Sequence, residues 1–205
     1  MKINTNRWNQ IRYTAFAPIY DGIARFGAQR KRSIELLALT PGERVLIVGA
    51  GTGADLPFLP EGVDIVAGDI TPAMVDRIRG RARKLGRCVT AEVMDGQSLP
   101  LPDGSFDAVI LHLIVAVIPD PVACLREAGR VLKPDGRAVV FDKFVPDALK
   151  PSLVRRVLNL ATNALFSDVT RQLGPLADQA GLRVTHREPA ALGGRFEIAI
   201  LHPEQ

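Results

Sequence analysis

The chain has 205 residues, 47% of them hydrophobic and 23% charged, which is typical of one globular domain large enough to bury a full core. Disordered and collagen-like classes are therefore excluded. The two isolated cysteines, Cys88 and Cys124, indicate neither a zinc site nor a disulfide framework, and we expect no metal site. The formal net charge of +4 fits an ordinary basic surface or attraction to an anionic partner.

The first residues, MKINTNRWNQIRYTAF, lack an apolar core followed by a small-residue cleavage site, so we expect no signal peptide. The longest apolar run, Ala108 to Ile118, is shorter than the roughly 20 residues that a spanning helix needs. We therefore predict a cytoplasmic protein. Seven basic residues oppose two acidic ones within residues 1–37, which leaves open peripheral contact with the inner face of an anionic membrane.

Helical patterning covers residues 9–39, with a break near Pro18, and turn residues follow at 39–42. Short apolar runs at 43–49 and 63–69 then predict strands that are buried on both faces.

A helix is expected to begin at Pro72, with Thr71 as its N-terminal cap. Further strands are predicted at 87–95 and 106–113, and helical apolar spacing follows at 119–133.

Pro134-Asp135-Gly136 is predicted to be a turn, followed by a fifth strand at 136–142 and helical segments at about 147–180. Two last strands, 182–188 and 195–201, flank a diglycine turn and should pair antiparallel. Alternating strands and helices predict an α/β fold. We expect a seven-stranded mixed sheet, mostly parallel with an antiparallel last strand, and helices on both faces.

The stretch VLIVGAGTGAD ends a predicted strand in three glycines, Gly49, Gly51 and Gly53. Glycines at a strand end allow a tight turn and a close approach of ligand to backbone. The next strand ends in Asp69, at the distance where a carboxylate can accept both hydroxyls of an adenosine ribose. With Ala54 the pattern also satisfies the dinucleotide fingerprint, so dinucleotide, adenosyl cofactor and a purely structural turn stay open.

Four segments in order resemble the class I S-adenosylmethionine-dependent methyltransferases, most closely the branch of quinone and phospholipid-headgroup methyltransferases. The segments are VLIVGAGTGADLPFLP, GDITPAMV, MDGQSLPLPDGSFDAVI and LREAGRVLKPDGRAVVFDKF. The resemblance covers about residues 40–143 and implies a Rossmann-like fold with S-adenosylmethionine as cofactor. It divides a single domain, 1–205, into a helical cap (1–40), a cofactor-binding core (41–143), a helical insert or lid (144–181) and a strand pair (182–205).

The resemblance also implies roles for individual residues. The glycine turn would line the methionine end of the cofactor, Asp69 would bind the ribose, Ile70 would pack on the adenine, and Asp95 would accept the adenine amino group. An alternative for Asp95 is a simple Asp-Gly turn. The cofactor-binding residues that it implies are Gly49, Ala50, Gly51, Gly53, Asp69, Ile70, Asp95, Gly96, Gln97 and His112.

One position departs from the family pattern. Ile47 stands two residues before the first glycine, where an acidic residue often orients the cofactor's ammonium group. The ammonium group would then rely on backbone carbonyls or on another side chain.

His112 is the candidate general base, since it is the one histidine near the predicted site; the alternative is a hydrogen-bonded residue that only shapes the pocket. Lys143 and Asp142, at the end of the fifth strand, would contact substrate or form a supporting salt bridge. In the N-terminal segment, Tyr13 and Tyr20 are candidate substrate contacts, Tyr20 within a PIYD element that resembles one closing over the site.

The residues 146–166 can form a basic amphipathic helix, which would lie on an anionic bilayer or pack internally in a lid. No exocyclic-amine motif with paired prolines follows the fourth strand, which argues against a nucleic-acid acceptor. The leading hypothesis is N-methylation of a phospholipid headgroup such as phosphatidylethanolamine. Alternatives are a quinone or other small-metabolite methyltransferase, a nucleotide-dependent dehydrogenase, and a regulatory protein that binds the cofactor without turnover. The sequence makes no prediction of oligomeric state.

Overall fold

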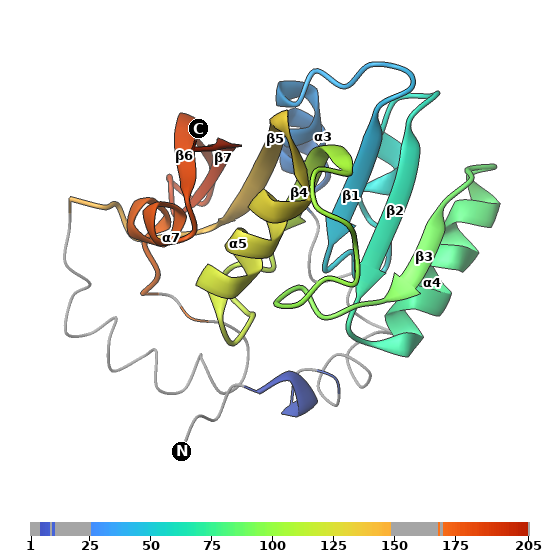
Figure 1. Cartoon of the computed structure of the whole chain (residues 1–205), viewed down its shortest axis with the longest axis horizontal. Coiled ribbons are helices and arrows are strands. Elements are labelled where there is room, and N and C mark those ends of the chain that lie inside the picture. Colours follow the sequence, from blue (N-terminus) through green and yellow to red (C-terminus); the bar gives the residue numbers. More distant parts are fainter. Residues whose placement is uncertain (1–4, 9, 11–25, 149–167, 169, 205) are drawn as a thin grey trace.

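The computed structural model describes residues 5–8, 10, 26–148, 168 and 170–204. Seven strands form one sheet in the order β3-β2-β1-β4-β5-β7-β6 (Figure 1). The strands are β1 (Arg44–Val48), β2 (Asp64–Asp69), β3 (Thr90–Val93), β4 (Phe106–His112), β5 (Leu132–Lys143), β6 (Leu182–Ala191) and β7 (Phe196–Pro203).

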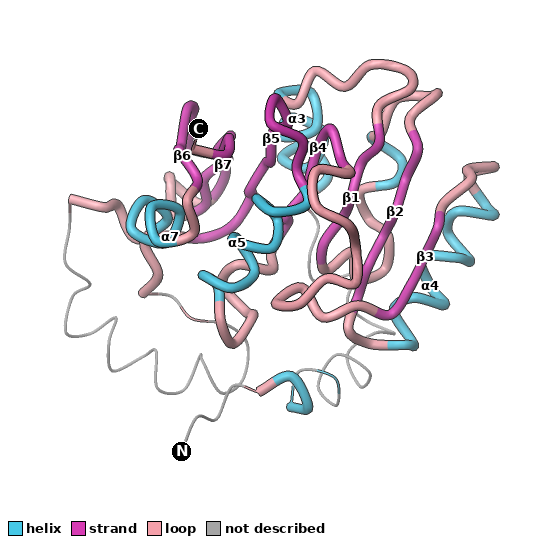
Figure 2. Tube along the Cα trace, viewed as in Figure 1, coloured by secondary structure: helices cyan, strands magenta, loops and turns pink. Residues whose placement is uncertain are grey.

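Neighbouring strands from β3 to β5 are parallel, and β7 lies antiparallel between β5 and β6. The prediction of a mostly parallel, seven-stranded mixed sheet is therefore confirmed. Figure 2 shows the helices and the connecting turns around this sheet. The helices are α3 (Gly27–Leu36), η1 (Leu56–Phe58, a 3-10 turn), α4 (Pro72–Lys84), α5 (Pro121–Val131) and α7 (Leu173–Gln179).

Two hydrophobic clusters cover the two faces of the sheet. One contains the apolar side chains of α5 and α7, and the other contains those of α3, η1 and α4. β1 contributes to both, because successive side chains of a strand point to opposite faces. Leu46 and Val48 join the first cluster, whereas Val45 and Ile47 join the second. Burial on both faces explains why β1 is a continuous apolar run.

Three local predictions are matched only in part by the structure. Residues 134–136 belong to β5 rather than to a separate turn, and the β4–β5 register shifts there, as in a bulge. Thr71 occupies the N-cap position of α4, but its side chain makes no capping bond. The helical predictions at 9–39 and 147–180 are confirmed over α3 and α7, and much of the remainder lies outside the described residues.

Within the described part of the chain, no helix combines the length and the hydropathy that crossing a lipid bilayer requires.

Candidate active site

A pocket opens at the carboxyl ends of the central parallel strands. Ligands of open α/β sheets bind at this edge. Eight of the predicted site residues line the pocket: Gly49, Ala50, Gly51, Asp69, Ile70, Asp95, Gly96 and His112.

The glycine turn after β1 forms one wall of the pocket. Gly49, Gly51 and Gly53 have φ values of +65°, +56° and +76°, in the left-handed region that favours glycine. A Cβ atom on Gly49 would lie 2.3 Å from Cδ1 of Ile114, which also lines the pocket. A larger residue at this position would collide with Ile114, so glycine lets that side chain lie against the turn. Gly53 does not line the pocket, and its N–H donates to the carbonyl of Ala50 within the turn.

Asp69 ends β2 and is held by two backbone N–H groups. Its Oδ2 accepts from Gly51 N and its Oδ1 from Thr71 N, both at 2.9 Å. A carboxylate has about four acceptor positions, so each oxygen can still accept from a ribose hydroxyl. Burial raises the pKa of Asp69, although the two N–H donors oppose that rise. The geometry is that of an oriented acceptor pair at the edge of the pocket.

Asp95 follows β3 and carries a second oriented carboxylate. Its Oδ1 accepts from the backbone N and from Nε2 of Gln97, each at 3.0 Å. Its Oδ2 accepts from Nδ2 of Asn6 at 2.5 Å. Gln97 itself does not line the pocket, so the structure places it behind Asp95 rather than against the ligand space.

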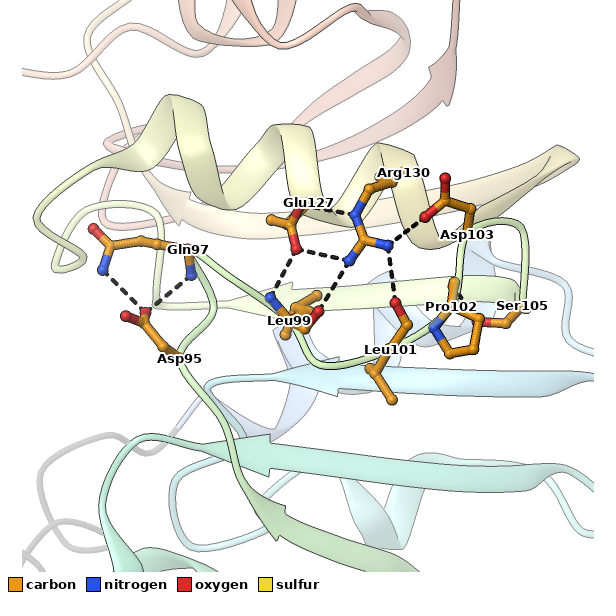
Figure 3. A network of polar contacts seen from close by, with 9 residues as sticks. All are labelled: Asp95, Gln97, Leu99, Leu101, Pro102, Asp103, Ser105, Glu127 and Arg130. Atoms are coloured by element: carbon orange, nitrogen blue, oxygen red, sulfur yellow. Dashed lines mark hydrogen bonds and ion pairs between the residues drawn. The ribbon is translucent and has the colours of Figure 1, made fainter.

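Helix α5 fixes the loop that carries Asp95 and Gln97 (Figure 3). Glu127 accepts from the backbone N of Leu99 at 2.7 Å. Arg130 donates to the carbonyl oxygens of Leu99 and Leu101 and pairs with Glu127. These contacts give a physical reason for the LREAGR segment of the sequence: it anchors the loop from a distance rather than touching the ligand.

His112, at the end of β4, has protein partners on both ring nitrogens. Nδ1 lies 2.7 Å from Oδ1 of Asp55, and Nε2 lies 2.7 Å from Oγ of Ser33. Ser33 Oγ also donates to the carbonyl of Arg30 at 2.8 Å. Both ring nitrogens are therefore engaged by protein groups, and the general-base role of His112 stays a prediction.

The same Asp55 oxygen accepts from Nη1 of Arg30 at 2.6 Å. Burial opposes ionisation of Asp55, but the charges and hydrogen bonds of His112 and Arg30 outweigh it and hold the pKa of Asp55 well below its usual range. Arg30, Asp55, His112 and Ser33 form one buried cluster, which we call the β1–β4 cluster. It joins α3, the glycine turn and β4.

The candidate substrate residues receive little support from the described contacts. Lys143 is not among the described residues that line the pocket, and its Nζ lies 5.7 Å from the ring centroid of Phe196. Asp142 is buried and accepts from Ala116 N at 2.8 Å, which holds the loop after β4. Burial raises the pKa of Asp142. Tyr13 and Tyr20 lie outside the described residues.

Sequence reasoning missed several residues that shape the site. Asn6 and Arg30 line the pocket from segments that precede β1. Gln10 donates to the carbonyl of Ile70 at 3.0 Å, so residues near the N-terminus cover the ends of β2 and β3 (Figure 1). Asp55 stands within the glycine stretch. Asp55 could have been found from sequence, because it is an acidic residue at the end of an apolar and glycine-rich run. The sequence around Asn6 or Arg30 gives no such indication.

A glycine turn after β1, with oriented carboxylates at the end of β2 and after β3, is the arrangement in which open α/β sheets bind nucleotide-type ligands. A family model described as a methyltransferase domain matches residues 46–140. A phosphatidylethanolamine N-methyltransferase from Cereibacter sphaeroides is 30% identical over 157 residues, covering 76% of this chain and 77% of that protein. A demethylmenaquinone methyltransferase from Thermus thermophilus is 34% identical over 154 residues, covering 71% and 70%.

The chain covers less of some relatives: it is 38% identical over 114 residues to a demethylmenaquinone methyltransferase from Tropheryma whipplei, 47% of that protein. Solved structures share the fold. A Haloferax volcanii methyltransferase in complex with the Trm112 activator has a TM-score of 0.76 at 18% identity, covering 94% of this chain and 98% of its own. An S-adenosylmethionine-dependent methyltransferase from Aquifex aeolicus has a TM-score of 0.64 at 22% identity, covering 84% and 88%.

This chain belongs to the class I S-adenosylmethionine-dependent methyltransferases, in the branch of its phospholipid and quinone relatives. It is an enzyme, and its cofactor is S-adenosylmethionine. The glycine turn and the two oriented carboxylates fit that cofactor.

Proposed function

We propose that this enzyme methylates the headgroup amine of a phosphatidylethanolamine-type phospholipid. The observation that carries the proposal is the Cereibacter sphaeroides relative, which aligns over 76% of this chain and 77% of its own length. The longest alignments therefore include an enzyme named for this acceptor. A quinone acceptor is the second candidate, because the Thermus thermophilus relative aligns over 71% of this chain at 34% identity.

When bound, the cofactor supplies a methyl group on a positively charged sulfur, which is a good leaving group. The chain's task is to hold that group in line with the acceptor, and positioning of this kind contributes roughly 7–11 kcal/mol in favourable cases. In the proposal, Asp69 binds the ribose hydroxyls and Asp95 accepts the adenine amino group. Gly49 and Gly51 let the methionine part approach the backbone. Apolar residues of the pocket, Ile114, Val117 and Ile118, exclude water from the transfer.

An amine acceptor must be neutral before it attacks the methyl group. We propose that His112 orients the pocket through Asp55 and Ser33, and that the amine loses its proton to solvent. This proposal follows from the two protein partners of the imidazole, at 2.7 Å each. Replacing His112 with Asn should then lower activity without moving the acidic limb of the pH–rate profile.

The membrane part of the proposal rests on sequence. Lys150, Arg155 and Arg156 stand among apolar residues in the stretch 146–166. A helix of that composition would bring the enzyme to an anionic bilayer, where each basic residue contributes about 1 kcal/mol of attraction. Most of this stretch lies outside the described residues.

The test of acceptor identity is a turnover assay that records product mass. The full chain and labelled S-adenosylmethionine are incubated with phosphatidylethanolamine vesicles, with a demethylated naphthoquinone in detergent, and with small soluble amines. We expect one or more methyl additions on the phospholipid. Methylation of the quinone alone would replace the proposal with the second candidate, and cofactor binding without transfer to any acceptor would support a regulatory protein instead.

Vesicle co-sedimentation tests the membrane part separately. A triple variant, Lys150→Ala with Arg155→Ala and Arg156→Ala, should lose binding to anionic vesicles. The matched control removes the same charge from exposed positions of α4: Arg77→Ala, Arg83→Ala and Lys84→Ala. Equal losses in both variants would mean that net charge, and not this segment, draws the enzyme to the membrane.

A further inference from the structure

Arg30 stands out among the described residues that line the pocket, because it alone there is an arginine or lysine. Its side chain is only 6% exposed. Buried arginines are rare unless they are paired, and Arg30 is paired with Asp55 at 2.6 Å. A guanidinium has five N–H donors, and Nη1 serves Asp55. Arg30 therefore brings a positive charge to the wall of the cofactor pocket.

The sheet order places Arg30 at one end of that pocket. Asp69 ends β2 and Asp95 follows β3, and both strands lie on one side of β1. Arg30 is bound to Asp55, which is bound in turn to His112 at the end of β4, on the other side of β1. The carboxylates thus mark the adenosine end of the pocket. Arg30 marks the opposite end, where the glycine turn meets β4 and the methionine part of the cofactor would lie.

The absence of an acidic side chain at position 47 makes the positive charge of Arg30 important for cofactor binding. Its side chain is 1% exposed and packs in the cluster beneath α3 and α4, so an acidic group is missing from that position. Among the described lining residues, the carboxylates are Asp69 and Asp95, both at the adenosine end. The methionine part of the cofactor carries one ammonium and one carboxylate. At this end of the pocket, the charged side chain among the described lining residues is that of Arg30.

We propose that Arg30 binds the carboxylate of the cofactor's methionine part, so that this enzyme recognises the methionine moiety through its carboxylate more than through its ammonium. Asp55 is a positioning residue, because it fixes the guanidinium from behind. The proposal rests on the cofactor and not on the acceptor, so it stands whichever acceptor is methylated.

The geometry around Asp55 supports this division of roles. One oxygen of Asp55 accepts from both Arg30 and His112, at 2.6 and 2.7 Å. Asp55 therefore fixes the guanidinium of Arg30 at the pocket wall while it also contacts the imidazole of His112. A charge-assisted bond from that guanidinium to a carboxylate in a water-poor site is stronger than one in solvent.

The test compares three ligands by isothermal titration calorimetry. S-adenosylhomocysteine carries both groups, its decarboxylated aminopropyl analogue keeps the ammonium, and its deaminated analogue keeps the carboxylate. We expect the wild-type enzyme to bind the decarboxylated analogue about 30-fold more weakly than S-adenosylhomocysteine, which is about 2 kcal/mol. Deamination should weaken binding less than about 5-fold, as expected for a group that meets only backbone carbonyls.

Arg30→Gln should lower the affinity for S-adenosylhomocysteine about 30-fold and leave the decarboxylated analogue bound as in the wild type. Unchanged binding of that analogue also shows that the variant is folded. The matched control is Arg32→Gln on the same helix, whose guanidinium pairs with Glu188 outside the pocket. Arg32→Gln should keep the preference of about 30-fold for S-adenosylhomocysteine over its decarboxylated analogue.

Two results would overturn the proposal. If Arg30→Gln keeps the wild-type preference for S-adenosylhomocysteine, then another group binds the carboxylate. If the variant loses affinity for all three ligands equally, then Arg30 only supports the fold. Arg30→Lys is a second variant that keeps the charge, and it should retain part of the preference.

Discussion

The two ends of the cofactor pocket are built in different ways. At the adenosine end, each carboxylate accepts from a backbone N–H two positions further along the chain, Asp69 from Thr71 and Asp95 from Gln97. Each also has one longer-range donor, Gly51 for Asp69 and Asn6 for Asp95. At the methionine end, Arg30 and His112 meet on Asp55 from 25 and 57 residues away. The first end is formed largely by local turns, and the second by tertiary packing of α3 against the sheet.

This difference separates binding from stability. The adenosine-end carboxylates accept hydrogen bonds from backbone N–H groups and neutral side chains, so their removal leaves no buried charge unpaired and should act mainly on the ligand. The β1–β4 cluster is a buried ion pair, and removal of one partner leaves an uncompensated charge. We therefore expect mutations at the methionine end to change the folding equilibrium as well as cofactor affinity, and mutations at the adenosine end to change mainly cofactor affinity.

The largest effect should come from Asp55→Ala. It leaves the Arg30 guanidinium buried without its anion, which costs about 3–5 kcal/mol of unfolding free energy. Urea unfolding followed by circular dichroism measures the loss. The control is Asp64→Ala, which breaks an exposed pair with Arg44 and should cost less than about 1 kcal/mol. Equal losses of unfolding free energy in the two variants would mean that the methionine end does not stabilise the fold through this buried ion pair.

Asp69→Ala should act on binding more than on folding. Two charge-assisted hydrogen bonds to the ribose would be lost, and the affinity for S-adenosylhomocysteine should fall about 100-fold or more. Titration calorimetry measures this, with Asp64→Ala on the same strand as the control. Wild-type affinity in Asp69→Ala would remove the ribose role from this residue.

Part of the adenosine end could be located from sequence because the signals are local. A buried parallel strand is a continuous apolar run, and the residues at its end lie at the ligand edge, which places Gly49 and Asp69. Asp95 was assigned from the family resemblance. Arg30 could not be predicted in this way. It is one of several basic residues in a helical segment, and nothing local distinguishes it from exposed Arg32. Only the packing of α3 turns Arg30 toward the pocket.

A smaller effect is expected at Asp95, where one hydrogen bond to the adenine amino group is at stake. Replacing the adenine of S-adenosylhomocysteine by hypoxanthine converts that amino donor to an oxygen acceptor. The wild-type enzyme should bind the hypoxanthine analogue about 10-fold more weakly. Asp95→Ala should bind both forms alike. If Asp95→Ala still prefers adenine by the same factor, then Asp95 is a turn residue held by Gln97 and Asn6, and the base is recognised elsewhere.

The smallest effect should be a change in the pH dependence of folding. The charges of His112 and Arg30 hold the pKa of Asp55 below its value in the unfolded chain, despite the opposing effect of burial. The stability that comes from this shift is fully present above the unfolded pKa of about 3.9 and is lost as the pH falls toward the lower folded pKa. Below about pH 4, the wild-type unfolding free energy should therefore fall more steeply than that of Asp55→Asn.

The difference in slope cannot exceed one proton, or about 1.4 kcal/mol per pH unit. Urea unfolding at several values between pH 6 and pH 3 measures both slopes. The adenosine end supplies the contrast, because burial raises the pKa of Asp69. A carboxylate with a raised folded pKa disfavours the folded state above that pKa. In Asp69→Asn, the unfolding free energy should therefore fall at low pH no less steeply than in the wild type. Parallel acid limbs for the wild type and Asp55→Asn would mean that Asp55 is not held ionised by its two partners, and that the two ends do not differ in charge coupling.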